Sequence, residues 1–159
     1  MGREDPSVPD RRRSVRVAAM IGVGLMAAVD EIVFHQLLAW HHFVDRSTTR
    51  FALASDGVLH ALELVLLVAG FFLLSDLRRR RELVPRSAWG GLVLGMGAFQ
   101  LWDGVVDHKV LRLHQVRYDV DLLPYDLAWN AAGVVLVVVG VLVLRAGRGA
   151  APHAGAGGR

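Results

Sequence analysis

The stretch Leu127–Leu144, LAWNAAGVVLVVVGVLVL, decides the fold of this chain. It contains no charged residue and approaches the ~20 residues with which a helix crosses the hydrocarbon core of a bilayer. Three further apolar blocks precede it, at residues 17–40, 58–74 and 88–106. Hydrophobic residues make up 53% of the 159 residues, above the roughly 45–50% of soluble domains. The sequence therefore predicts an all-α integral membrane four-helix bundle, with a single four-span domain at 15–145.

The ends of the chain are predicted to lie outside this membrane domain. Residues 1–14 combine two prolines with an arginine cluster, and residues 146–159 are rich in glycine and alanine. Both are predicted to be disordered tails. Arginines followed by an apolar run also resemble a secretory signal peptide, with Met26-Ala27-Ala28 preceding a cleavage site. The polar pattern after Val29 continues at helical spacing, which favours an uncleaved first span.

Short connections and small residues indicate how the spans pack. The loop at residues 75–87 is short enough to make the second and third spans an antiparallel hairpin. Gly91 and Gly95 form a small-xxx-small pair on the third span, which either allows close approach of a neighbouring helix or lines a lipid-facing surface.

Basic residues are distributed unevenly between the two sides of this arrangement. Most of the 18 lysines and arginines lie in the N-terminal region, the second loop or the C-terminal region: Arg3, Arg11 to Arg13, Arg16, Arg78 to Arg81, Arg86, Arg145, Arg148 and Arg159. The positive-inside rule then puts both termini in the cytoplasm. The basic charge is thus explained by topology, and we expect a lipid bilayer and no nucleic acid as partner. Cysteine is absent, which excludes disulfides and thiolate metal sites.

Acids and histidines interrupt the spans at helical spacing. Glu31, His35 and His42 follow i, i+4, i+11, and Asp56, His60 and Glu63 follow i, i+4, i+7. On the third span the set is Gln100, Asp103, Asp107 and His114, provided that the helix extends that far; on the fourth it is Asp126 and Asn130. Asp30 and His41 share an adjacent face, although His41 also suits the membrane interface beside Trp40. Because the spans alternate in direction, these sets are expected to meet in the outer half of the bilayer.

Such a constellation needs a source of positive charge. An acid at the centre of a membrane helix costs ~2.5–3.5 kcal/mol and usually serves a function. The cations within reach are Lys109 and Arg112, so either several acids are protonated or a metal ion supplies the charge. The predicted metal ligands are Glu31, His35, His60, Glu63, Asp103 and Asp107. Further ligands or partners of ligands are Asp30, His42, Asp56, His114, Asp126 and Asn130. Histidine with carboxylates and no cysteine suits one or two divalent ions of zinc, iron, manganese or copper.

Three classes of function are compatible with this site. The first is a metal-dependent enzyme, with His108 as a candidate general base. The second is a metal-handling or assembly factor that passes an ion to a partner. The alternative needs no such metal: a proton relay, or haem held by histidines on facing helices.

Four strings of the sequence also resemble a known family. They are AAVDEIVFHQLLAWHH (27–42), DGVLHALEL (56–64), FQLWDGVVDHKVLRLHQVRY (99–118) and DLLPYDLAWNAAG (121–133). They are similar to a bacterial family of four-span membrane proteins described as a domain of unknown function. The resemblance implies a multi-pass protein of the bacterial inner (plasma) membrane. It also implies a partner on the periplasmic side or in a respiratory complex.

Overall fold

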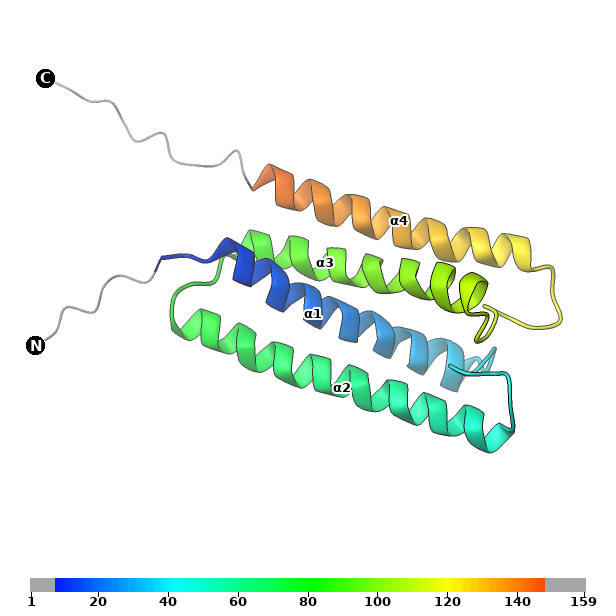
Figure 1. Ribbon diagram of the computed structural model, residues 1–159. Helices are drawn as coiled ribbons and strands as arrows, with labels where there is room; N and C mark the ends of the chain where they lie inside the picture. Colours follow the sequence, from blue (N-terminus) through cyan, green and yellow to red (C-terminus); the bar gives the residue numbers. More distant parts are fainter. Residues whose placement is uncertain (1–7, 148–159) are drawn as a thin grey trace, which may run out of the picture.

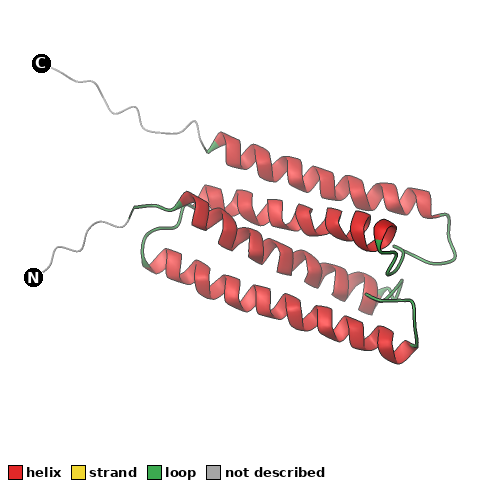
Figure 2. Ribbon diagram, in the orientation of Figure 1, coloured by secondary structure: helices red, strands yellow, loops and turns green. Residues whose placement is uncertain are grey.

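Residues 8–147 fold into four long helices that alternate in direction along the chain. The computed structural model describes residues 8–147, and that part contains helices and loops but no strand (Figure 2). The outer parts of both predicted tails, residues 1–7 and 148–159, lie outside the described residues. The elements are α1 (Arg11–Asp30) continued by the π-helix η1 (Glu31–Leu37), α2 (Thr49–Arg79), α3 (Pro85–Trp102) continued by the π-helix η2 (Asp103–Val110), and α4 (Leu122–Ala146).

The helices extend beyond the apolar blocks because polar residues cap their ends. α1 begins at Arg11, so the prediction of a disordered tail to residue 14 is wrong for its last four residues. The Asp10 carboxylate accepts from the Arg13 amide at 2.9 Å, and the Arg13 guanidinium pairs with Glu82 at 3.0 Å. α2 likewise begins nine residues before the predicted block, where the Thr48 hydroxyl accepts from the Phe51 amide. Side-chain acceptors of this kind satisfy amides that the first helical turn leaves free.

α1 and α3 form the central pair of the bundle. α2 packs on α1 and α4 packs on α3, so the helices follow the order α2, α1, α3, α4 (Figure 1). A Cβ atom at Gly91 would lie 2.4 Å from the Val15 carbonyl oxygen, and one at Gly95 only 2.1 Å from that of Ala19. The glycine pair therefore lets the backbones of α1 and α3 approach closely, which confirms one of the two alternatives for these glycines.

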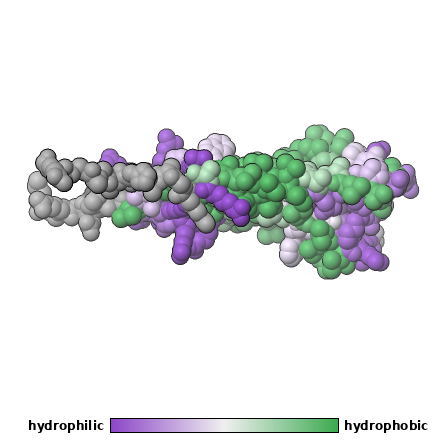
Figure 3. All heavy atoms as spheres, turned by 90° about the horizontal axis from the view of Figure 1, so that it is seen from above, coloured by the Kyte–Doolittle hydropathy of each residue, from purple (hydrophilic) through white to green (hydrophobic). Residues whose placement is uncertain are grey.

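In the described part of the chain, three helices are long and apolar enough to cross a membrane: Arg11–Leu37, Thr49–Arg79 and Leu122–Ala146. Figure 3 shows apolar surface over the middle of the molecule and hydrophilic residues towards its two ends. α3 with η2 is not among the three, because glycines and the polar residues of η2 dilute its apolar character. α3 with η2 lies between α1 and α4. That it forms a fourth membrane span remains a prediction.

Candidate metal centre

The buried ionisable side chains gather at one end of the bundle, where both central helices change to π-helical geometry. In each π-helix the chain forms bonds of the i→i+5 kind: the Leu38 amide donates to the Val33 carbonyl at 2.9 Å, and the Leu111 amide to that of Val106 at 2.7 Å. Residues five apart then share a face. Eight members of this cluster have 3% exposure or less: Asp30, Glu31, His35, His41, Asp56, Asp103, His108 and His114.

Both π-helices end in the same way. Ala39 and Arg112 adopt left-handed conformations with φ of 48° and 53°, which a continuing helix does not allow. The helices therefore stop at Leu37 and Val110. The prediction that His42 and His114 extend the helical faces of their spans is wrong, since both residues lie in the loops that follow.

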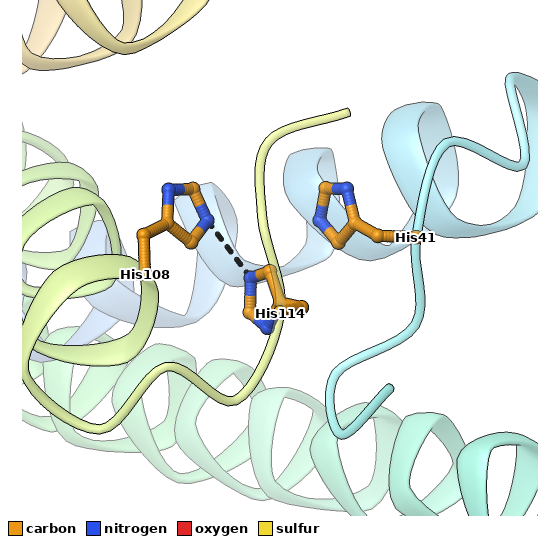
Figure 4. Close-up of side chains that lie close together, drawn as sticks. All are labelled: His41, His108 and His114. Atoms are coloured by element: carbon orange, nitrogen blue, oxygen red, sulfur yellow. Dashed lines mark hydrogen bonds between the residues drawn. The ribbon is translucent and has the colours of Figure 1, made fainter. Parts of the chain in front are cut away.

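Three side chains from η2 and the loop after it form the tightest group. His108 Nε2 lies 3.1 Å from Asp103 Oδ2 and 2.8 Å from His114 Nε2. His114 Nε2 is also 3.4 Å from Asp103 Oδ1. Figure 4 shows the rings of His108 and His114 turned towards each other, with His41 beside them. The three groups thus direct two ring nitrogens and a carboxylate to one point.

The loop histidines are oriented by backbone carbonyls. His41 Nδ1 lies 2.8 Å from the Val116 oxygen, and His114 Nδ1 lies 2.8 Å from the Phe43 oxygen. A carbonyl only accepts, so Nδ1 carries the proton in each ring and Nε2 keeps its lone pair. Burial lowers the pKa of His41 to about 2, which leaves this ring neutral. Metal-bound histidines are held in this way, with one nitrogen on the metal and the other donating to an oxygen.

Carboxylates surround the histidine of η1. His35 Nε2 lies 3.7 Å from Asp30 Oδ2, while His35 Nδ1 lies 2.7 Å from Glu31 Oε2 and 3.3 Å from Asp56 Oδ1. Asp56 also accepts at 2.6 Å from His42, whose side chain is 27% exposed. Neither ring nitrogen of His35 has a well-aligned hydrogen bond within the described part of the chain. Close approach without alignment is the arrangement expected of atoms that face a common ion.

Distances within the cluster fit metal coordination. Ligand atoms lie within 4.8 Å of one another in three sets: His41 with His108 and His114, Asp30 with His35 and His41, and Glu31 with His35 and Asp56. Bonds of ~2.0–2.1 Å to a tetrahedral ion place its ligand atoms about 3.3 Å apart. Within residues 8–147, Asp103 and the three acids of these sets form no ion pair with lysine or arginine. The donors and their uncompensated charge therefore suit a divalent ion.

The structure does not bring every predicted residue into this cluster. His60 pairs with Glu63 at 2.8 Å, and its side chain is 47% exposed on the surface of α2. Asp107 is buried but makes no ion pair in the described part of the chain. Asp126 pairs with Lys109 at 2.6 Å, and Asn130 donates to the Asp126 carbonyl at 2.9 Å.

His41 is the member that the helical pattern left undecided, and His108 was predicted to be a base and not a ligand. A repeated motif identifies both. Asp30, His35 and His41 follow the spacing Asp-x4-His-x5-His, and so do Asp103, His108 and His114. A search for i+4 partners passes over a separation of five, which becomes one face only in a π-helix.

The comparison with known proteins covers both this cluster and the helices that carry it. The family model "Predicted membrane protein (DUF2243)" matches residues 17–147, which include every residue of the cluster. No curated protein and no solved structure was found to match. The family match confirms the resemblance seen in the sequence and supports a membrane location. This chain belongs to the DUF2243 family of predicted membrane proteins.

Proposed function

We propose that this protein is a membrane metalloprotein that holds divalent transition-metal ions in the cluster at one end of its bundle. The observation that carries the proposal is the orientation of His41 and His114. A carbonyl from another segment fixes Nδ1 of each ring, so that each Nε2 is available to a metal ion in the cluster. We further propose that this cluster lies in the outer half of a bacterial plasma membrane, with both termini in the cytoplasm.

An apolar pocket beside the cluster favours an enzyme over a closed storage site. A cavity of about 420 Å³ lies between α1, α3 and α4, lined chiefly by Phe34, Trp40, Gln100, Val116, Tyr125 and Trp129. The Val116 carbonyl orients His41, and the Trp129 ring lies 5.9 Å from that of His108. A catalytic metal keeps a position open to substrate. We therefore infer a metal-dependent reaction on a lipid-soluble substrate that enters from the bilayer.

The packing of the histidines suits metal ions better than haem. Their ring centroids are separated by 4.4 to 6.0 Å, and His41 stacks on His114 within 4° of parallel. A porphyrin held by two histidines must lie between their rings, and stacked rings leave no space for it. A proton relay is the competing function, favoured by the contacts that link half-buried His42 through Asp56 to His35.

Metal content of the detergent-purified protein tests the proposal. We expect wild type to carry stoichiometric metal by elemental analysis, and His114→Ala to retain about half of it or less, because one ligand is lost from a small set. His60→Ala is the matched control, since His60 lies outside the cluster. It should bind as wild type does. Circular dichroism would check that both variants remain helical.

One result would overturn the metal centre. It is a wild-type protein that carries no stoichiometric metal and gains no thermal stability from zinc, iron, manganese or copper, although an ion that binds only the folded state must stabilise it. The cluster would then be assigned to proton transfer.

A further inference from the structure

We propose that the chain is an internal duplication and that each half holds one metal ion. Residues 11–74 align with residues 84–147 without a gap, at the constant offset of 73 that separates Asp30 from Asp103. The repeated Asp-x4-His-x5-His motif lies at that offset. Ser14 and Ser87 match at the same offset, as do Gly22 and Gly95. Equal spacing over a whole hairpin is the signature of a repeat.

The structure follows the same offset outside the cluster. α2 begins at Thr49 and α4 at Leu122, each after a capping side chain. The left-handed residues Ala39 and Arg112 correspond as well. A Cβ atom at Gly22 would lie 2.1 Å from the Leu92 carbonyl oxygen, and one at Gly95 equally close to that of Ala19, which is the counterpart of Leu92. The two hairpins therefore contact each other through equivalent residues.

Distances among the histidines reveal a pseudo-twofold axis between the halves. The His35–His41 and His108–His114 centroid distances are 4.6 and 4.5 Å, and the crossed pairs His35–His114 and His41–His108 are both 6.0 Å. His41 donates to Val116, and His114 donates to Phe43, the counterpart of Val116. Because α1 and α3 point the same way (Figure 1), the axis runs along the helices and passes between the stacked rings of His41 and His114.

This symmetry divides the ligands into two equivalent sets. One is Asp30, His35 and His41; the other is Asp103, His108 and His114. Each is a two-histidine, one-carboxylate set, which leaves coordination positions open on the ion. The proposal rests on the proposed function and specifies its stoichiometry, two ions for each chain.

The two ligand sets have different surroundings, and from this difference we infer different roles for the two ions. Beside His35 the first half places Glu31 and Asp56. Their counterparts beside His108 are Gly104 and Trp129, and a Cβ at Gly104 would lie 2.7 Å from the Trp129 ring. Carboxylates thus surround one set, whereas the apolar pocket adjoins the other through Trp129. The ion of Asp103, His108 and His114 is the one that a substrate in the pocket reaches.

Manganese loading of the full chain in detergent tests the pair of sites. Elemental analysis should give two ions for each wild-type chain, and electron paramagnetic resonance should show the broadening of two neighbouring spins. His35→Gln and His108→Gln should each retain one ion and a spectrum of isolated Mn²⁺. The wild-type count and spectrum need no variant, so the test stands even if a substitution prevents folding.

The outcomes separate the two proposals. One ion in wild type, removed by either substitution, would place a single ion on the axis and overturn the pair while leaving the proposed function intact. No bound manganese, zinc, iron or copper at all would overturn the proposed function itself.

Discussion

Gln100 is a polar side chain buried in the wall of the apolar pocket. Its Nε2 lies 3.5 Å from the Trp129 carbonyl oxygen, and its Oε1 has no hydrogen-bond partner within residues 8–147. A buried acceptor left unpaired costs about 1–3 kcal/mol. A ligand hydroxyl would satisfy this oxygen, whereas a plain hydrocarbon would not. The residue therefore favours a lipid-soluble alcohol or phenol over an alkane of the same length.

This preference gives a prediction for the pocket. We expect 1-dodecanol at about ten times its Kd to raise the melting temperature of the purified protein by about 3–5 °C, and dodecane to have little effect. Ala132→Leu should abolish the shift, because Ala132 lines the pocket and a larger side chain fills it. Ala131→Leu, its neighbour outside the pocket, should retain the shift. If dodecanol and dodecane raised the melting temperature equally, the shift would come from the detergent micelle and not from the pocket.

At the scale of the helices, hydropathy located the elements well and their ends poorly. Each apolar block lies largely within a helix, because burying or inserting apolar surface is what selects these segments. The ends depend on single capping groups such as Asp10 and Thr48. An average over a window does not register these.

The candidate site was predicted in part, for a reason of geometry. Glu31 and His35 come together as a pair at i, i+4. His60 and Glu63 pair at i, i+3, but the His60 ring lies on the outer surface of α2, while Glu63 is buried. The separation of five residues within each repeat places two side chains on one face only if the segment is a π-helix. The sequence alone does not impose one, because the bonds and left-handed residues that end these helices depend on the loops folding over them.

The packing of α1 against α3 gives a prediction at the same scale. Gly95→Ala should lower the melting temperature, since its Cβ would lie 2.1 Å from a backbone oxygen that cannot move alone. Overpacking of this kind costs about 1–3 kcal/mol. Gly57→Ala is the control: no atom of residues 8–147 lies within 4 Å of a Cβ there, so alanine should be neutral or stabilise the helix by about 0.5–1 kcal/mol. Thermal unfolding in detergent measures both, and an unchanged melting temperature for Gly95→Ala would contradict the close contact.

At the scale of the whole molecule, the two ends of the bundle differ in charge. The start of α1, the α2–α3 connection and the end of α4 lie together at the end opposite the buried cluster of histidines and carboxylates (Figure 1). That end carries the arginines of residues 11–16, 78–81, 86 and 145. The positive-inside rule therefore predicts an orientation with the arginines in the cytoplasm and the cluster near the outer surface.

Single cysteines test this orientation, since the chain has none of its own. Ser47 and Arg78 are exposed residues at opposite ends of the bundle. A membrane-impermeant thiol reagent added to intact cells should label Ser47→Cys and spare Arg78→Cys, and permeabilisation should make both reactive. The reverse pattern would turn the histidine–carboxylate cluster towards the cytoplasm. It would also change the expected source of metal ions, because we expect a cluster near the outer surface to take them from outside the cell, through half-buried His42 and buried Asp56. We therefore expect a further difference between the two orientations. Intact cells loaded with metal in the cold, with loading stopped by an impermeant chelator, should contain metal-bound protein only if the protein has the orientation that the arginines predict.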